Sequence, residues 1–109
     1  MKNKYEINNT VKVNDGMHTE DFNIDLSGRI GTITDVILNE GETPLYQVYW
    51  DSKTLNSLEL SSIKYLEKQT YDWEFSLLYE NEIVKVEQRC TETETEKTLE
   101  AINNKLEVS

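Results

Sequence analysis

The chain has 109 residues, the length of one domain, and its 21 acidic against 11 basic residues give a formal net charge of −10. Nucleic-acid binding depends on Lys and Arg side chains that neutralise phosphates, so this charge argues against DNA or RNA as a partner. No segment is apolar enough for a membrane span or a secretory leader, and the single cysteine, Cys90, suits a reducing compartment. We therefore expect a cytoplasmic protein with no membrane partner.

The first third of the chain predicts two strands separated by a long loop. Residues 6–13 alternate apolar and polar side chains, which indicates a first strand, and residues 14–27 carry turn-forming residues. Residues 29–38 are rich in β-branched side chains and indicate a second strand. Gly28 and Gly31 predict a bulge or a close approach of two backbones at its start.

The middle of the chain predicts three more strands and one helix. From residue 45 onward, Tyr46, Val48 and Trp50 alternate with more polar positions and should face the core. Residues 61–70 have the apolar spacing of a short helix that crosses between strands. Residues 73–79 and 83–86 should close the sheet, with a single 3₁₀ turn at residues 80–82.

These elements predict a mainly β fold: a small SH3-like barrel of about five strands, spanning residues 1–90, with one short crossover helix. Residues 91–109 form an acidic tail whose Thr/Glu run, residues 91–96, should repel itself and stay solvated. Leu99, Ile102 and Leu106 then recur at helical spacing. The pattern allows either a short amphipathic helix, docked on the barrel or on a partner, or a frayed tail.

Few residues support catalysis. His18 is the only histidine and falls in a predicted loop, and Cys90 follows a predicted strand, where a buried, unreactive thiol is the simpler interpretation. Phosphate-binding glycine loops, nucleophile elbows and spaced His/Cys clusters are absent from the sequence. We therefore expect a protein that is not an enzyme.

Carboxylates in the long loop suggest a metal site. Asp21, Asn23 and Asp25 have the spacing that begins an EF-hand loop, but the sixth position is not glycine and the twelfth is not glutamate. What remains is a looser calcium site, in which Asp21 and Asp25 project from one side of the loop and Asp51 converges with them from a strand end. Carboxylates of second rank are Asp15, Glu20, Glu80 and Glu82.

Three separated motifs follow one another along the chain: Asp21-Phe22-x-Ile24-Asp25-Leu26-Ser27-Gly28-Arg29-x-Gly31, Trp50-Asp51-Ser52-x-Thr54-Leu55 and Asp72-Trp73. They resemble a family of small acidic bacterial proteins that includes a cyanobacterial calcium-binding protein, and the likeness covers most of residues 7–87. The resemblance implies a compact SH3-like domain and calcium bound by surface carboxylates outside any EF-hand. Asp21, Asp25 and Asp51 match its motifs, and their role as ligands is our interpretation.

Two functions follow as hypotheses. The first is a non-enzymatic calcium-binding protein with weak surface sites, of affinity about 10⁻⁵–10⁻³ M. The second is a protein-interaction module, an adaptor or an inhibitor, whose acidic surface attracts a basic partner. Aromatic residues could also frame a peptide groove, with Tyr49 and Tyr79 as the candidates for exposure.

Overall fold

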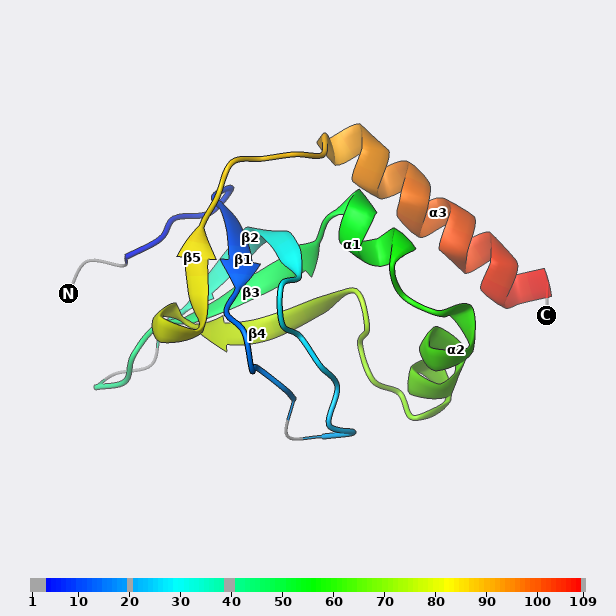
Figure 1. Cartoon of the computed structure of the whole chain (residues 1–109), viewed down its shortest axis with the longest axis horizontal. Helices are drawn as coiled ribbons and strands as arrows, with labels where there is room; N and C mark the ends of the chain where they lie inside the picture. The colour runs from blue at the N-terminus through cyan, green and yellow to red at the C-terminus, as the bar shows by residue number, and fades with distance from the viewer. Residues whose placement is uncertain (1–3, 20, 39–40, 109) are drawn as a thin grey trace.

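The computed structural model describes residues 4–19, 21–38 and 41–108. Five strands form one antiparallel sheet in the order β4-β3-β2-β1-β5, and the three helices lie at the other end of the molecule (Figure 1). The elements in chain order are β1 (Thr10–Val13), β2 (Ile30–Ile37), β3 (Leu45–Trp50), α1 (Ser52–Asn56), α2 (Leu60–Lys68), β4 (Phe75–Tyr79), the 3₁₀ helix η1 (Glu80–Glu82), β5 (Ile83–Lys85) and α3 (Glu92–Val108).

The centre of the sheet is the β2–β3 pair. Tyr46, Val48 and Trp50 alternate along β3 and are almost fully buried, as their spacing predicts. Gly31 of β2 lies so close to β3 that a Cβ there would meet the carbonyl oxygen of Tyr49 at 2.2 Å. The predicted close approach is therefore present at Gly31, whereas Gly28 forms a turn with φ of +76°.

The strands at the two edges, β4 and β5, follow each other in the chain and are linked by η1, the 3₁₀ turn predicted at residues 80–82. β4 pairs with β3, and β5 pairs with β1. Within the described residues no pairing joins β4 to β5, so the sheet is open and the expected closed barrel is not confirmed. The expected mainly β composition is also wrong, since the helices contain more residues than the strands.

Two helices, rather than one, connect β3 to β4. α2 is the predicted crossover helix, and its Ile63 is buried in the core. α1 follows directly after β3 and was not predicted from the sequence. It begins because the side chain of Asp51 caps it, accepting a hydrogen bond from the backbone N–H of Thr54 at 2.9 Å.

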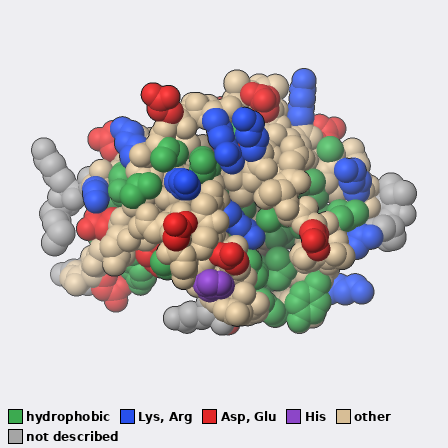
Figure 2. Space-filling view, viewed as in Figure 1, with side chains coloured by type: hydrophobic (Ala, Val, Ile, Leu, Met, Phe, Trp, Pro, Cys, Tyr) green, Lys and Arg blue, Asp and Glu red, His purple; other side chains and the backbone are tan. Residues whose placement is uncertain are grey.

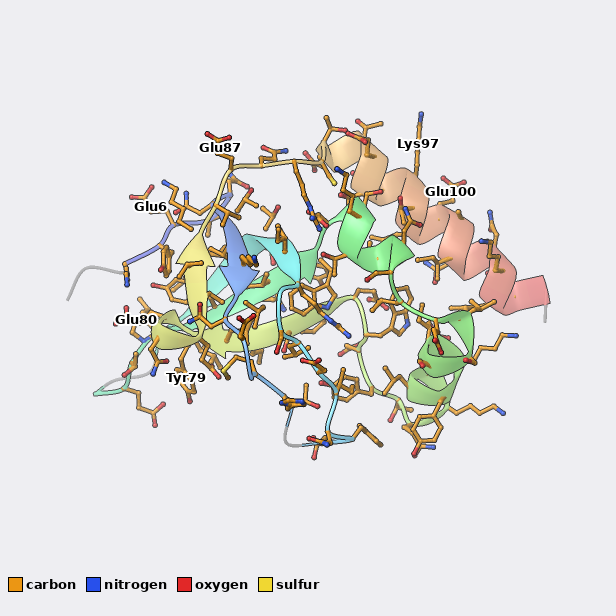
Figure 3. The ribbon with its side chains drawn as sticks, in the orientation of Figure 1. Glu6, Tyr79, Glu80, Glu87, Lys97 and Glu100 are labelled. Carbon is orange, nitrogen blue, oxygen red and sulfur yellow. The ribbon has the colours of Figure 1, made fainter. Side chains whose placement is uncertain are left out.

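The C-terminal segment is a docked helix. α3 begins at Glu92, inside the Thr/Glu run, whose side chains are mostly exposed to solvent, as expected, although the run is helical. The run starts a helix because Thr91 and Glu94 exchange side-chain-to-backbone hydrogen bonds of 3.0 and 3.1 Å, a capping box. The inner face of α3 contacts α1 and α2, and Ile102 is only 8% exposed. On its outer face, Lys97 and Glu100 point away from the molecule (Figure 3).

One hydrophobic core joins the sheet to the helices. Its buried members from the strands, the loops and all three helices include Val11, Ile33, Tyr46, Val48, Trp50, Leu55, Ile63, Trp73, Leu78, Ile83 and Ile102. Leu99 and Leu106 of α3 pack against this cluster from outside. Helix α3 is thus part of the packed structure. None of the helices in the described part of the chain is both long and apolar enough to cross a bilayer.

Candidate functional site

The three predicted calcium ligands lie in three different places. Asp25 lines a cleft between the long loop and α2, Asp21 lines a hollow against β4, and Asp51 lines a third one beside the start of α3. Across the described residues, no group of three or more His, Cys, Asp and Glu side chains is placed to hold a metal ion. Glu20, a second-rank candidate, lies outside those residues.

The loop that carries Asp21 and Asp25 is a turn rather than an extended segment. Phe22 and Asn23 have φ values of +62° and +48°, in the left-handed region, so side chains do not alternate between two faces here as they would along an extended segment. Phe22 is 44% exposed, whereas Leu26 is buried. The backbone of the turn is fixed by Thr19, whose hydroxyl donates to the carbonyl of Asp21 and accepts from the N–H of Ile24.

Both carboxylates of this turn are exposed to solvent. Asp25 Oδ1 accepts a hydrogen bond of 2.9 Å from the backbone N–H of Ser27 and lies 4.0 Å from Nε2 of His18. The hydrogen bonds from Ser27 hold the pKa of Asp25 below its ordinary value, with a smaller contribution from His18. Asp25 is thus a charged group on the surface, and His18 is its exposed neighbour.

Asp51 is buried at a junction where its oxygens already have partners. The guanidinium of Arg89 binds it through two hydrogen bonds, Nε to Oδ2 at 2.7 Å and Nη2 to Oδ1 at 3.0 Å. Oδ1 also accepts the capping hydrogen bond from Thr54. Burial raises the pKa of Asp51, but the hydrogen bonds from Arg89 and Thr54 outweigh it, so the pKa lies below its ordinary value. Calcium at this carboxylate would have to displace Arg89.

The same junction connects three distant parts of the chain. Thr54 donates its hydroxyl proton to the carbonyl of Ile30, and this hydroxyl accepts from Arg89 Nη2 at 3.1 Å. Beside it, the hydroxyls of Ser52 in α1 and Thr98 in α3 lie 2.6 Å apart. Asp51 therefore has a structural role: it ties β2, α1 and the segment before α3 together.

A second arginine, Arg29, lies in the cleft between the long loop, α2 and the segment that leads into β4. The cleft has a volume of about 430 Å³. Six of its eighteen lining residues are aromatic, and among them the ring of Phe22 meets those of Tyr65 and Tyr71 edge-on, at centroid distances of 6.0 and 5.4 Å. In the centre of Figure 2, a Lys/Arg side chain lies beside exposed hydrophobic side chains.

Arg29 is partly buried and has no charged partner in contact. Its guanidinium lies over the ring of Trp50, 5.3 Å from the centroid, and makes no hydrogen bond or ion pair with any residue that the structure describes. Burial lowers the pKa of Arg29, and electrostatic interactions with the carboxylate of Asp25 and the phenol group of Tyr71 act in the opposite direction. A guanidinium still remains protonated at neutral pH, so the cleft contains a positive charge with free N–H donors.

Carboxylates surround this positive charge at a greater distance. Asp25, Glu59 and Asp72 line the cleft together with Arg29. Next to it, burial raises the pKa of Glu74, and the negative charges of Asp72 and Glu67 raise it further. The cleft thus combines one inner cation, aromatic walls and an acidic rim.

Sequence reasoning missed this site. Arg29 and Phe22 appear in the sequence analysis only as members of the first of three motifs. A Gly-Arg pair beside an exposed Phe gives little signal, because the aromatic residues of the cleft come from segments far apart in the chain. Of the aromatic residues predicted to be exposed, Tyr79 is 46% exposed, while Tyr49 is partly covered by Phe75. Cys90 is buried, as predicted.

Comparison of the chain with protein-family models, with curated protein sequences and with solved structures gave no match.

Proposed function

We propose that this protein is a non-enzymatic binding module that takes an apolar, mainly aromatic side chain of a partner into the Arg29 cleft. The observation that carries the proposal is the guanidinium of Arg29, which is partly buried beside aromatic rings and has no ion-pair partner among the described residues, in a chain of net charge −10. A chain with this many carboxylates has ample acidic side chains to pair with each arginine. A cation left without such a partner inside a cleft is typical of a binding site rather than of a core.

The size and lining of the cleft support a side chain as ligand. Its volume of about 430 Å³ lies in the range of small-ligand sites, and its lining is mainly hydrophobic with a few polar groups. Phe22 and Tyr65, two of its aromatic residues, are 44% and 54% exposed. These rings contact each other edge-on and leave part of their apolar surface exposed at the cleft, which favours an apolar occupant.

A neutral probe tests the cleft itself. Titration of N-acetyl-phenylalanine amide into ¹⁵N-labelled protein should shift the amides of residues 22–29 and 58–73 in a saturable way. Tyr65→Ala should weaken this binding severalfold, because it removes one aromatic wall. Tyr79→Ala removes a similarly exposed tyrosine that does not line the cleft, and it should leave the binding unchanged. Shifts that do not saturate, or that spread over the whole surface, contradict the proposal.

Calcium binding remains a second proposal, restricted to the 21–25 turn. The observation in its favour is that Asp21 and Asp25 are both exposed on one short turn whose backbone is fixed by Thr19. Asp51 does not join them, since Arg89 and Thr54 occupy its oxygens. A site with so few protein ligands would be weak, with a dissociation constant of about 10⁻⁴–10⁻³ M.

Calcium titration followed by ¹⁵N spectra tests this second proposal. We expect saturable shifts in residues 21–27 that are lost in the Asp21→Asn/Asp25→Asn double variant. The Glu92→Gln/Glu96→Gln double variant removes the same charge from α3 and should keep them. Small shifts at all acidic residues, equal in both variants, would show counterion screening and contradict a calcium site.

A further inference from the structure

The arrangement of charge in the Arg29 cleft restricts the chemistry of its ligand. A guanidinium presents N–H donors in a planar fork, and its best partner is a carboxylate that accepts two of them. Nothing in the described part of the chain supplies that carboxylate, since Asp51 is bound to Arg89 and the carboxylates of the cleft lie beyond 4.0 Å from Arg29. The ligand therefore has to bring an anionic group to the inner part of the cleft.

The acidic residues at the rim of the cleft favour a positively charged group on the ligand. Asp25, Glu59 and Asp72 line it, and the whole chain carries a net charge of −10, so a simple anion is repelled as it approaches. A ligand that carries its negative charge at one end and positive charges behind it avoids this repulsion. Its cations would face the acidic rim while its anion reaches Arg29.

We infer that the cleft binds the C-terminus of a basic polypeptide, with the terminal carboxylate on Arg29 and an aromatic last side chain against Phe22, Tyr65 and Tyr71. In a C-terminal residue, the carboxylate and the side chain branch from the same carbon atom. One residue can therefore fill the cationic and the aromatic parts of a single cleft, and the chain needs to leave in only one direction, over the acidic rim. The inference rests on the proposed function.

Two peptides that differ only at the terminal group test this inference. The probes are the acetylated tetrapeptide Lys-Lys-Gly-Phe as the free acid and as the amide, titrated into the full-length ¹⁵N-labelled protein at low salt. We expect the free acid to bind about tenfold more tightly than the amide, because the amide cannot form the paired charged hydrogen bonds. The same peptide with serines in place of the lysines should bind several times more weakly, by loss of attraction to the rim.

Variants test whether Arg29 causes the difference in affinity between the free-acid and the amide peptide. In Arg29→Gln the dissociation constants of the acid and the amide should agree within about a factor of two. Arg29→Lys retains the charge but not the planar fork of N–H donors, so its ratio of amide to acid dissociation constants should lie between those of Arg29→Gln and the wild type. Lys68→Gln removes a positive charge from an exposed position of α2 outside the cleft and should keep the tenfold ratio.

The possible results distinguish a failure of the inference about the C-terminal carboxylate from a failure of the proposed binding function. Equal binding of acid and amide to the unchanged protein, with saturable shifts in the cleft, overturns the carboxylate inference and leaves the binding module standing. Stronger binding of the serine peptide than of the lysine peptide overturns the basic ligand. If neither peptide nor N-acetyl-phenylalanine amide perturbs the cleft, both the inference and the proposed function are wrong.

Discussion

The two arginines of this chain reach the end of β3 from different sides, and they meet very different surroundings. Arg89 binds the carboxylate of Asp51 with two hydrogen bonds, and a third goes to the hydroxyl of Thr54. Arg29 lies over the ring of Trp50, the residue immediately before Asp51, and no described residue gives it such a partner. The junction around Arg89 supplies both charges of its ion pair, whereas the described residues of the cleft around Arg29 supply only one in contact.

The difference separates a structural charge from a charge that is available to a ligand. A partly buried charge stabilises a fold when its partner and its hydrogen bonds are all present, and loss of one partner is then costly. A partly buried charge without a partner adds little to stability and leaves its binding capacity free. The predictions below follow from this contrast between the Arg89 junction and the Arg29 cleft.

Removal of α3 should have the largest effect, because it uncovers the junction and the core beside it. Deletion of residues 92–109 exposes the core surface that Ile102, Leu99 and Leu106 cover. We expect a loss of about 3–5 kcal/mol in the free energy of unfolding, measured by urea titration. The Lys97→Ala/Glu100→Ala variant changes only the outer face of α3 and serves as the control. A loss below about 1 kcal/mol would show that α3 is not part of the folded unit.

Removal of the carboxylate at the junction should have the next largest effect. Asp51→Ala deletes the cap of α1 and leaves Arg89 without its ion-pair partner. Because the side chain of Arg89 is 35% exposed, solvent screens part of the pair, and we expect a loss of about 2–3 kcal/mol. Asp15→Ala, an exposed carboxylate on a turn, is the control for the change in charge. Equal urea midpoints for the two variants would contradict the structural role of Asp51.

Acid should weaken the same junction. The pKa of Asp51 is depressed in the folded protein, so its stabilising effect is complete above the ordinary aspartate pKa of about 4. This stabilising effect is lost as the pH falls through the lower pKa that Asp51 has in the folded protein. The difference in stability between the wild type and Asp51→Asn should therefore shrink between about pH 5 and pH 2 in urea titrations. A difference that stays constant over this interval would mean that the Asp51 charge adds nothing to stability.

Neutralisation of the arginine in the cleft should have the smallest effect on stability. Arg29→Gln loses the contact with the Trp50 ring, but it also relieves the burial of an unpaired charge. We expect the free energy of unfolding to change by less than about 1 kcal/mol in either direction. Arg89→Gln is the matched comparison, and it should be clearly less stable than Arg29→Gln. If Arg29→Gln lost as much as Arg89→Gln, Arg29 would be a structural residue.

The number and approximate positions of the strands could be predicted from the sequence, because local patterns carry that information, whereas their order in the sheet was not predicted. Tyr46, Val48 and Trp50 alternate as a half-buried strand must, and the turn at residues 80–82 separates two apolar segments. The start of α3 was harder to predict, because charge repulsion among its glutamates argues against a helix, while the capping pair Thr91 and Glu94 favours one. That capping spacing is visible in the sequence.

The candidate site could not be predicted in the same way. Asp51 follows a strand and resembles a ligand at a strand end, but Ser52, Thr54 and the apolar Leu55 after it are also the signature of a capped helix. Its bond to Arg89 spans 38 positions of the chain, which no local pattern encodes. The Arg29 cleft likewise depends on a left-handed turn at Phe22 and Asn23, and a bulky residue such as phenylalanine rarely adopts this conformation.

The Nε–H groups of the two arginines test the central contrast most directly, because a ¹H–¹⁵N spectrum resolves them and the variants Arg29→Lys and Arg89→Lys assign them. In the free protein we predict a slowly exchanging signal from Arg89, which is bound to Asp51, and a rapidly exchanging, weak signal from Arg29. The free-acid tetrapeptide should strengthen the Arg29 signal and leave that of Arg89 unchanged, and its amide should do neither. Two equally protected signals in the free protein, or an Arg29 signal that does not respond to the acid, would contradict the account.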